Sequence, residues 1–205
     1  MSREINGQIR NVQPGRTRTG AVDRRRTYDM AYIGVFTVLI TICSWISIPT
    51  AIPFSLQTFA VFFAVSILGG KRGTLSVVVY VLLGAIGVPV FAEFTGGIGI
   101  ILGNTGGYII GFIFSALVMW LTESLLGRKL WVQGISMVLG LIACYVFGTA
   151  WFMFIYMRDV GAVGLSTVLG WCVVPFIIPD AVKIALALMM SSMLKKPLSG
   201  MMGES

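Results

Sequence analysis

Runs of apolar residues alternate with short polar connections along most of the chain. Six such runs lie between residues 30 and 194, and few formal charges fall inside them. A helix needs about 20 predominantly apolar residues to cross the hydrocarbon core of a bilayer. The pattern therefore predicts an all-α integral membrane protein whose six transmembrane helices occupy 30–49, 56–68, 74–88, 108–126, 131–157 and 176–194.

Three segments depart from a simple helical crossing. The second and third runs are short, so we expect these two helices to lean or to recruit flanking residues. Residues 89–107 are too rich in glycine for a straight helix and too apolar for an ordinary aqueous loop. Irregular backbone is tolerated at membrane depth only where protein or a cavity satisfies its polar groups. We expect a folded-back loop there, and a short interfacial helix within 161–174.

Composition agrees with this pattern and sets the domain organisation. Hydrophobic residues make up 57% of the 205 positions and charged residues 11%, against about 25% charged in an average soluble domain. We expect a basic, flexible cytoplasmic tail at 1–29, one membrane domain at 30–196 and a short cytoplasmic tail at 197–205. The first tail lacks the apolar core of a cleavable signal peptide, so the first helix is expected to direct insertion.

Lysine and arginine predict the orientation of the helices. Thirteen of the fifteen fall in the N-terminal tail, the second and fourth connections and the C-terminal end, all on one side of a six-helix topology. The other side receives Glu93 and the neighbouring Arg158 and Asp159. Because cytoplasmic connections carry the excess of positive residues, both chain ends are predicted to be cytoplasmic. This rule accounts for the net charge of +7, and nucleic acid is not an expected partner.

Several chemistries lack the residues they need. The chain has no histidine, and Cys43, Cys144 and Cys172 lie in apolar stretches without CxxC spacing. A disulfide framework, a histidine-based metal site and a histidine-containing catalytic triad are therefore not expected. The Gly70 and Lys71 step lacks the spacing of a phosphate-binding loop, so ATP hydrolysis by this chain is not expected. We expect no enzyme activity, no metal and no cofactor.

Asp180 and Lys183 are the most informative polar residues. They lie near the external end of an otherwise apolar helix, and their spacing of three places them on one face. Ionisable groups inside a membrane are costly and usually face a cavity or one another. One interpretation is an ion pair that only fixes helix packing. The favoured one is a ligand-binding pair, in which Asp180 accepts from N–H donors and Lys183 donates to a carbonyl or carboxylate.

Two further stretches carry polar or aromatic groups at predicted helix starts. Asn104 and Tyr108 lie where the glycine-rich segment becomes the fourth helix, and Phe54 and Gln57 lie where a proline-rich turn enters the second. Asn104 can donate and accept, and neighbouring glycines allow the backbone close to a ligand. An ordinary helix cap or an interfacial tyrosine explains the same residues equally well.

Three segments, in this order and spacing, resemble the BioY family of biotin-binding membrane proteins, which are S components of energy-coupling factor transporters. They are IPFSLQTFAVF, GAIGVPVFAEFTGGIGIILGNTGGYIIGF and PFIIPDAVKIALA. The resemblance covers about residues 30–196. It implies a six-helix S-component fold in the bacterial cytoplasmic (inner) membrane. It also implies external capture of biotin, and docking on a transmembrane coupling protein driven by two cytoplasmic ATPases.

The resemblance also implies roles for single residues. Asn104 and Asp180 match positions expected to hold the ureido ring of biotin, and Lys183 matches a cation in the same pocket. Tyr108 is a further expected ligand-binding residue. Phe54, Gln57 and Phe91 are expected in the same pocket. In helix one, the family's small-xxx-small docking pattern is imperfect, because Val35 follows Ala31 four residues later, with Gly34 between them.

Two alternatives differ from biotin capture. The first is an S component or small carrier for a different ring-bearing vitamin, because a few side chains change pocket chemistry. The second is a membrane-embedded enzyme that uses Asp180 and Lys183 as an acid and base pair. No nucleophile or metal-ligand set accompanies these two residues in the sequence, which disfavours the enzyme.

Overall fold

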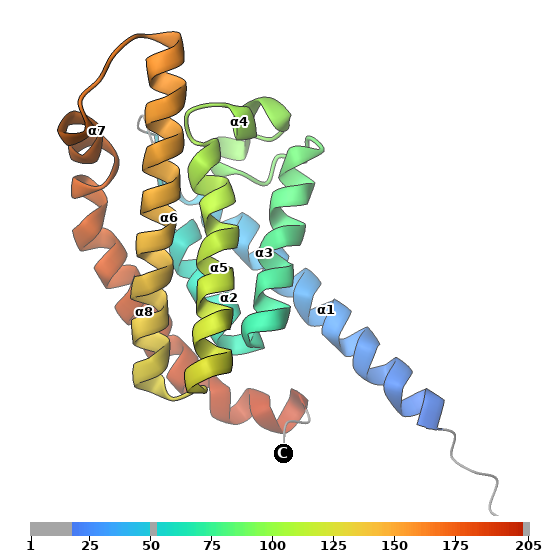
Figure 1. Cartoon of the computed structure of the whole chain (residues 1–205). Helices are drawn as coiled ribbons and strands as arrows, with labels where there is room; N and C mark the ends of the chain where they lie inside the picture. Colours follow the sequence, from blue (N-terminus) through green and yellow to red (C-terminus); the bar gives the residue numbers. More distant parts are fainter. Residues whose placement is uncertain (1–17, 50–52, 203–205) are drawn as a thin grey trace, which may run out of the picture.

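Helices form almost all of the protein in the computed structural model, which describes residues 18–49 and 53–202. Six longer helices assemble into one bundle (Figure 1): α1 (Arg18–Trp45), α2 (Gln57–Leu68), α3 (Gly70–Ala85), α5 (Gly106–Leu126), α6 (Leu130–Asp159) and α8 (Val174–Met202). Short elements cap one end: β1 (Ser47–Ile48), β2 (Phe54–Ser55), η1 (Ala92–Phe94), α4 (Ile98–Leu102) and α7 (Leu165–Cys172). The two strands pair antiparallel.

The prediction of a helical, multi-pass membrane protein is confirmed, whereas the number of six crossings is not. Among the described residues, four helical stretches are long and apolar enough to cross a bilayer: Arg26–Trp45, Gly106–Leu126, Leu130–Asp159 and Leu165–Leu194, the last of which joins α7 to α8. Helix α2 has 12 residues and α3 has 16, so length alone does not make them crossings. Six crossings with both ends cytoplasmic stay a prediction.

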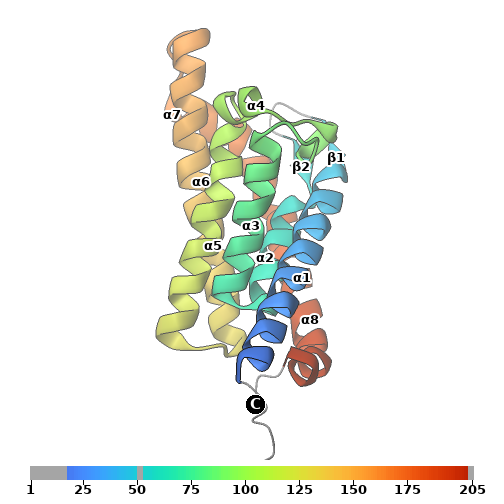
Figure 2. The same cartoon turned by 90° about the vertical axis from the view of Figure 1, so that its right-hand side faces the viewer.

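Helix α2 occupies the centre of the bundle. Eleven of its 12 residues are buried, and it packs against α1, α3, α5 and α8 (Figure 2). A helix that is apolar on all sides is typical of a fully enclosed core position. This position accounts for the short second run in the sequence, because a helix surrounded by protein need not match the thickness of the lipid.

Helices α5 and α6 pack closely along their length through small residues. A Cβ atom on Gly107 would lie 2.2 Å from Trp151 of α6, and one on Gly148 would lie 2.3 Å from Tyr108 of α5. Neither distance is compatible with a side chain, so both positions require glycine unless the helices separate. Close approach through small residues is the usual way in which helices associate inside a bilayer.

The basic connections lie together at one end of the bundle, which we call the basic end. The α2–α3 turn carries Lys71 and Arg72, and the α5–α6 turn carries Arg128 and Lys129. Figure 1 shows both turns at the lower end of the molecule. The charge pattern in the sequence therefore corresponds to a real grouping in space.

Helices extend into both segments that the sequence predicted as tails. Helix α1 begins at Arg18, inside the segment 1–29, and its Asp29 forms an ion pair with Arg72 at 3.0 Å. Helix α8 continues to Met202, inside the segment 197–205. A continuous helix keeps its backbone groups paired, which favours extension of a spanning helix beyond its apolar run. Residues 1–17, 50–52 and 203–205 lie outside the described residues.

The glycine-rich segment folds over the end opposite the basic end, as a loop that contains η1 and α4 (Figure 1). The Gly97 amide donates to the Gly84 carbonyl at 2.7 Å, which ties the loop to the end of α3. The Trp45 ring stacks on Phe94 at 4.8 Å and ties it to α1. Helix α7 confirms a short helix within 161–174.

Candidate ligand-binding site

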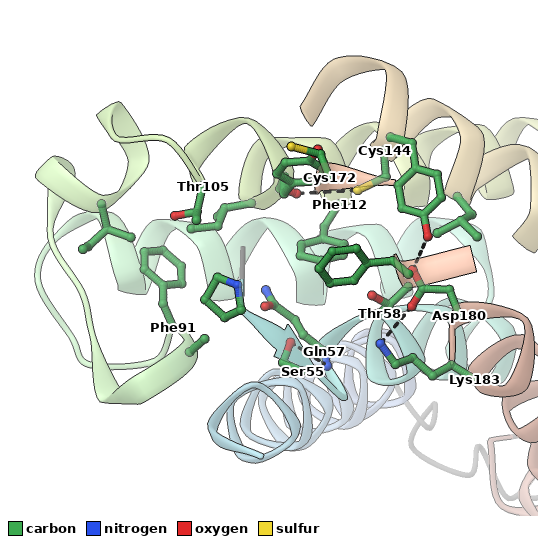
Figure 3. Close-up of a pocket in the computed structure, with 18 of the residues that line it drawn as sticks. Ser55, Gln57, Thr58, Phe91, Thr105, Phe112, Cys144, Cys172, Asp180 and Lys183 are labelled. Carbon is green, nitrogen blue, oxygen red and sulfur yellow. Dashed lines mark hydrogen bonds and ion pairs between the residues drawn. The ribbon is translucent and has the colours of Figure 1, made fainter. Parts of the chain in front are cut away.

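A cavity of about 260 Å3 lies between the folded loop and the centre of the bundle. Residues from seven parts of the chain line it: Pro53, Ser55, Gln57, Thr58, Phe91, Ala92, Glu93, Thr95, Ile100, Thr105, Tyr108, Ile109, Phe112, Leu141, Cys144, Tyr145, Cys172, Phe176, Asp180 and Lys183. Figure 3 shows Phe91 and Thr105 at one end of the cavity and Asp180 and Lys183 at the other. The exposed Glu93 belongs to the loop end, so the cavity reaches the surface there.

Asp180 and Lys183 form an ion pair at the inner end of this cavity. Lys183 Nζ lies 2.8 Å from Asp180 Oδ1, and the two side chains are 5% or less exposed. The spacing of three residues on α8 brings both groups to one face, as the sequence predicted. A buried pair of opposite charges is electrically neutral, which is the condition under which a membrane interior tolerates ionised groups.

Two aromatic residues complete the surroundings of the ion pair. The Tyr145 hydroxyl on α6 donates a hydrogen bond to Asp180 Oδ2 at 2.5 Å. The Lys183 ammonium lies 4.3 Å from the centre of the Phe54 ring, a cation–π arrangement. Phe54 also stacks on Phe176 of α8 at 5.8 Å. Both carboxylate oxygens of Asp180 are therefore held in fixed directions, and each keeps a lone pair for another donor.

The wall formed by the start of α2 carries a second polar group. Gln57 Nε2 donates to the Tyr80 hydroxyl at 2.9 Å, and the Gln57 side chain is buried beside the cavity. Ser55 Oγ accepts a hydrogen bond from the Gln57 backbone amide at 3.3 Å. Thr58, one residue after Gln57, also lines the cavity. The α2 wall therefore offers amide and hydroxyl groups rather than charges.

Tyr108 of α5 lines the cavity with its hydroxyl already engaged. The hydroxyl lies 3.1 Å from Thr149 Oγ1 on α6, and the ring packs where Gly148 leaves room. Cys144 lies beneath it, with Sγ 3.7 Å from the Tyr108 carbonyl oxygen. Tyr108 therefore presents its ring to the cavity, because its hydroxyl already has a hydrogen-bond partner.

The structure brings together most of the site residues that the sequence indicated. Five of them line one cavity: Gln57, Phe91, Tyr108, Asp180 and Lys183. Phe54 adjoins it through its cation–π contact with Lys183. Asn104 differs, because it is exposed in the turn before α5 and does not line the cavity. Its neighbour Thr105 does.

Several lining residues were not singled out from the sequence. Tyr145, Phe112 and Phe176 lie inside apolar runs, where an aromatic residue facing a cavity looks like one facing lipid. Glu93, which the charge pattern assigns to an external connection, is exposed and also lines the cavity mouth. Of these residues, only Tyr145 could have been singled out from the sequence. It carries a hydroxyl within an apolar run, and a buried tyrosine O–H needs a hydrogen-bond partner.

The site offers hydrogen bonding rather than reactive chemistry. Within the described residues, no three histidine, cysteine or acidic side chains group closely enough to hold a metal ion. The ion pair provides one anionic acceptor and one cationic donor at the closed end, with aromatic walls around them. Such a site suits a small ligand with a polar head that both donates and accepts, and with an apolar body.

Comparisons with known proteins agree with this arrangement. The chain is 42% identical over 165 residues to the biotin transporter BioY of Thermotoga maritima, which covers 80% of this chain and 93% of that protein. It is 38% identical over 168 residues to a probable biotin transporter BioY of Pyrococcus horikoshii, covering 82% and 96%.

A solved structure has the same fold. The crystal structure of the S-component for biotin from an ECF-type ABC transporter superposes with a TM-score of 0.75 at 27% identity, covering 84% of this chain and 93% of that one. The family model described as the BioY family matches residues 15–200. The resemblance first drawn from three short segments is thus confirmed over most of the length, and the chain belongs to the BioY family.

Proposed function

We propose that this protein is a membrane substrate-binding component that captures biotin in the cavity for uptake, and that it is not an enzyme. The observation that carries the proposal is the buried Asp180–Lys183 pair, 2.8 Å apart at the closed end of the cavity. Its support is membership of a family whose named relatives are biotin transporters. No cofactor is required, since biotin is the cargo.

The ureido ring of biotin matches the polar end of the cavity. Its two N–H groups are donors and need acceptors, which the free lone pairs of Asp180 supply. Its carbonyl needs a donor, and the Lys183 ammonium has protons beyond the one directed at Asp180. The apolar remainder of the ligand would lie against the rings of Phe176 and Phe112. Every polar group taken from water would then have a partner, which burial requires.

The acid chain of biotin would extend towards the loop end of the cavity. Thr105 lines that end, and Asn104 lies one residue away at the surface. Asn104 therefore lies at the acid-chain end and not beside the ureido ring, where the family resemblance expected it. We retain it in the proposed site as a residue that reaches the ligand once the turn before α5 moves inward. Tyr108, Gln57 and Phe91 would contact the ligand from the walls.

The proposed topology has six crossings with both chain ends in the cytoplasm of a bacterium, across its inner membrane. Helices α2 and α3 would be the two short crossings, consistent with the enclosed position of α2. The basic end would face the cytoplasm, where positive residues are retained. The loop whose residues line the cavity mouth lies at the opposite end (Figure 1), so the cavity would open to the exterior.

Transport would need partners that supply energy, because no phosphate-binding loop is present in the sequence. We propose a transmembrane coupling protein and two cytoplasmic ATPases, as the family implies. Helix α1 offers a docking face, since Ala31, Gly34 and Val35 are exposed and a Cβ on Gly34 would meet nothing within 4 Å. Val35 is larger than a strict small-residue pattern prefers.

Calorimetry on the purified full chain tests the proposal. Tight biotin binding is expected, and Asp180→Asn should weaken it by about 10- to 100-fold, because one charged acceptor is lost. Absence of biotin binding, or unchanged affinity in the variant, contradicts the assignment. Displacement of biotin by thiamine or riboflavin at similar concentrations would instead favour a carrier for another vitamin.

A further inference from the structure

A second, larger hollow lies at the basic end of the bundle, far from the biotin cavity. It has a volume of about 760 Å3 and is lined by the N-terminal part of α1, the start of α3, the end of α5 and Arg128. We call it the basic groove. Figure 1 shows α1 diverging from α3 and α5 towards this end, which opens the space between them. Nothing in the proposed transport cycle uses this groove.

The charges of the basic groove do not cancel. Among the side chains that the structure describes, four cationic ones line it, Arg26, Lys71, Arg72 and Arg128, against the two carboxylates of Asp29 and Glu123. Each carboxylate already has an arginine: Arg72 lies 3.0 Å from Asp29, and Arg128 lies 3.1 Å from Glu123. Two positive charges are therefore in excess.

The excess belongs to Arg26 and Lys71. Within the part of the chain that the structure describes, neither side chain forms an ion pair, and both are exposed. The Glu123 carboxylate is also occupied from a second side, because Oε2 accepts the Gly70 backbone amide at 2.9 Å. That contact fixes the start of α3 against α5, so Lys71 projects from a rigid position.

The remaining walls of the groove are apolar and face outward. Met30 of α1 is 67% exposed, Leu75 of α3 is 47% exposed and Trp120 of α5 is 38% exposed. All three residues line the groove together with its charged groups. An occupant that matches both the charged and the apolar walls needs a negatively charged head and an apolar tail. The head would lie beside Lys71 and Arg26, and the tail along Met30, Leu75 and Trp120. A free phosphate or an acidic peptide matches only the charged wall.

We infer that the basic groove is a binding site for an acidic phospholipid, whose phosphate lies beside Lys71 and Arg26 and whose acyl chains lie along α1, α3 and α5. Basic pockets between membrane helices at the interface are suited to acidic headgroups, and each basic residue near the surface contributes about 1 kcal/mol to their attraction. The partly exposed Trp120 lines the same groove, and tryptophan is enriched where membrane helices meet lipid headgroups. A lipid in this place would brace α1 against the bundle.

Trp120 provides a direct reporter of the lipid. Phospholipids with brominated acyl chains quench tryptophan fluorescence on contact, and the contribution of Trp120 is the difference between the full chain and its Trp120→Phe variant. In mixed micelles, brominated phosphatidylglycerol should quench Trp120 at about one thirtieth of the mole fraction that brominated phosphatidylcholine needs, because two basic residues contribute. Lys71→Ala should reduce this preference about five-fold and leave the contribution of Arg26.

Lys129→Ala is the matched control, since Lys129 is an exposed lysine at the same end that does not line the groove. Its preference for phosphatidylglycerol should be unchanged. Equal quenching by the two lipids, or a preference that Lys71→Ala leaves unchanged, would overturn the inference. Displacement of phosphatidylglycerol by millimolar glycerol phosphate would also overturn it, because the groove would then be a phosphate site. Biotin affinity measured by calorimetry does not depend on any of these lipid results, so the two proposals can fail separately.

Discussion

The hydroxyl of Tyr145 on α6 donates a hydrogen bond to the carboxylate of Asp180 on α8, 35 residues later in the chain. This bond and the ion pair with Lys183 hold the two oxygens of Asp180 from different helices. A carboxylate held in this way is oriented before any ligand arrives. Prior orientation reduces the entropy cost of binding and thereby strengthens it.

Replacing Tyr145 by phenylalanine tests its role in positioning Asp180. The variant keeps the ring and loses one hydrogen bond to a charged acceptor, so biotin affinity should fall by about 10-fold. Tyr156→Phe on the same helix is the matched control, since the Tyr156 ring stacks on Phe152 and does not line the cavity. Calorimetry on both variants gives the comparison. Equal affinities for the two would show that Tyr145 does not orient the carboxylate.

Removing one charge of the Asp180–Lys183 pair should affect the stability of the protein differently from removing both. Lys183→Met leaves a buried carboxylate without its cation, so the free energy of unfolding should fall by about 3 kcal/mol. The double variant Asp180→Leu with Lys183→Met removes both charges and should recover most of that loss, yet bind no biotin. Thermal unfolding in detergent measures the first effect and calorimetry the second.

Neutralising the exposed Arg158–Asp159 pair is the control for this experiment, and it should change neither quantity. A double variant of Asp180 and Lys183 that still binds biotin tightly would contradict the proposed recognition of the ureido ring. If Lys183→Met were as stable as the parent, the buried Asp180 carboxylate would not need the charge of Lys183 to stabilise it.

Gly148 should be intolerant of a side chain because of its contact with Tyr108. A Cβ atom there would lie 2.3 Å from the Tyr108 ring, so Gly148→Ala must push the ring into the cavity or separate α5 from α6. We expect stability to fall by about 1–3 kcal/mol, the usual cost of overpacking, and biotin affinity to fall with it. Thermal unfolding and calorimetry check the two effects.

Gly170→Ala in α7 is the matched control for Gly148→Ala, because a Cβ there meets nothing within 4 Å. Alanine favours an exposed helix over glycine by roughly 0.5–1 kcal/mol, so this variant should be as stable as the parent or more stable. A Gly148→Ala variant that behaves like Gly170→Ala would mean that the α5–α6 contact is looser than the geometry indicates.

Asn104 provides a test of movement in the turn before α5. If the turn moves inward over the bound ligand, Asn104→Ala should weaken biotin binding by several-fold, the cost of one hydrogen bond, while the unfolding temperature without biotin stays unchanged. The exposed position of Asn104 predicts that second result. Unchanged affinity would place Asn104 outside the binding site.

The length and charge of the apolar runs accounted for most of the architecture. Helices α5, α6 and α8 contain the runs predicted for them, and the spacing of Asp180 and Lys183 placed both groups on one face. These features depend on residues that are close in the sequence. The three segments that resemble the BioY family added the expectation of a biotin site. The lengths of the apolar runs alone do not predict such a site.

Features that depend on how helices meet were decided only by the tertiary structure. Hydropathy could not tell that α2 is enclosed by protein rather than by lipid, because both surroundings favour the same residues. Tyr145 reaches Asp180 only because α6 packs beside α8 in the bundle. Asn104 lies at the surface because the backbone turns just before α5. Local pattern thus determined which segments are helices, and packing between distant segments determined which side chains share a cavity.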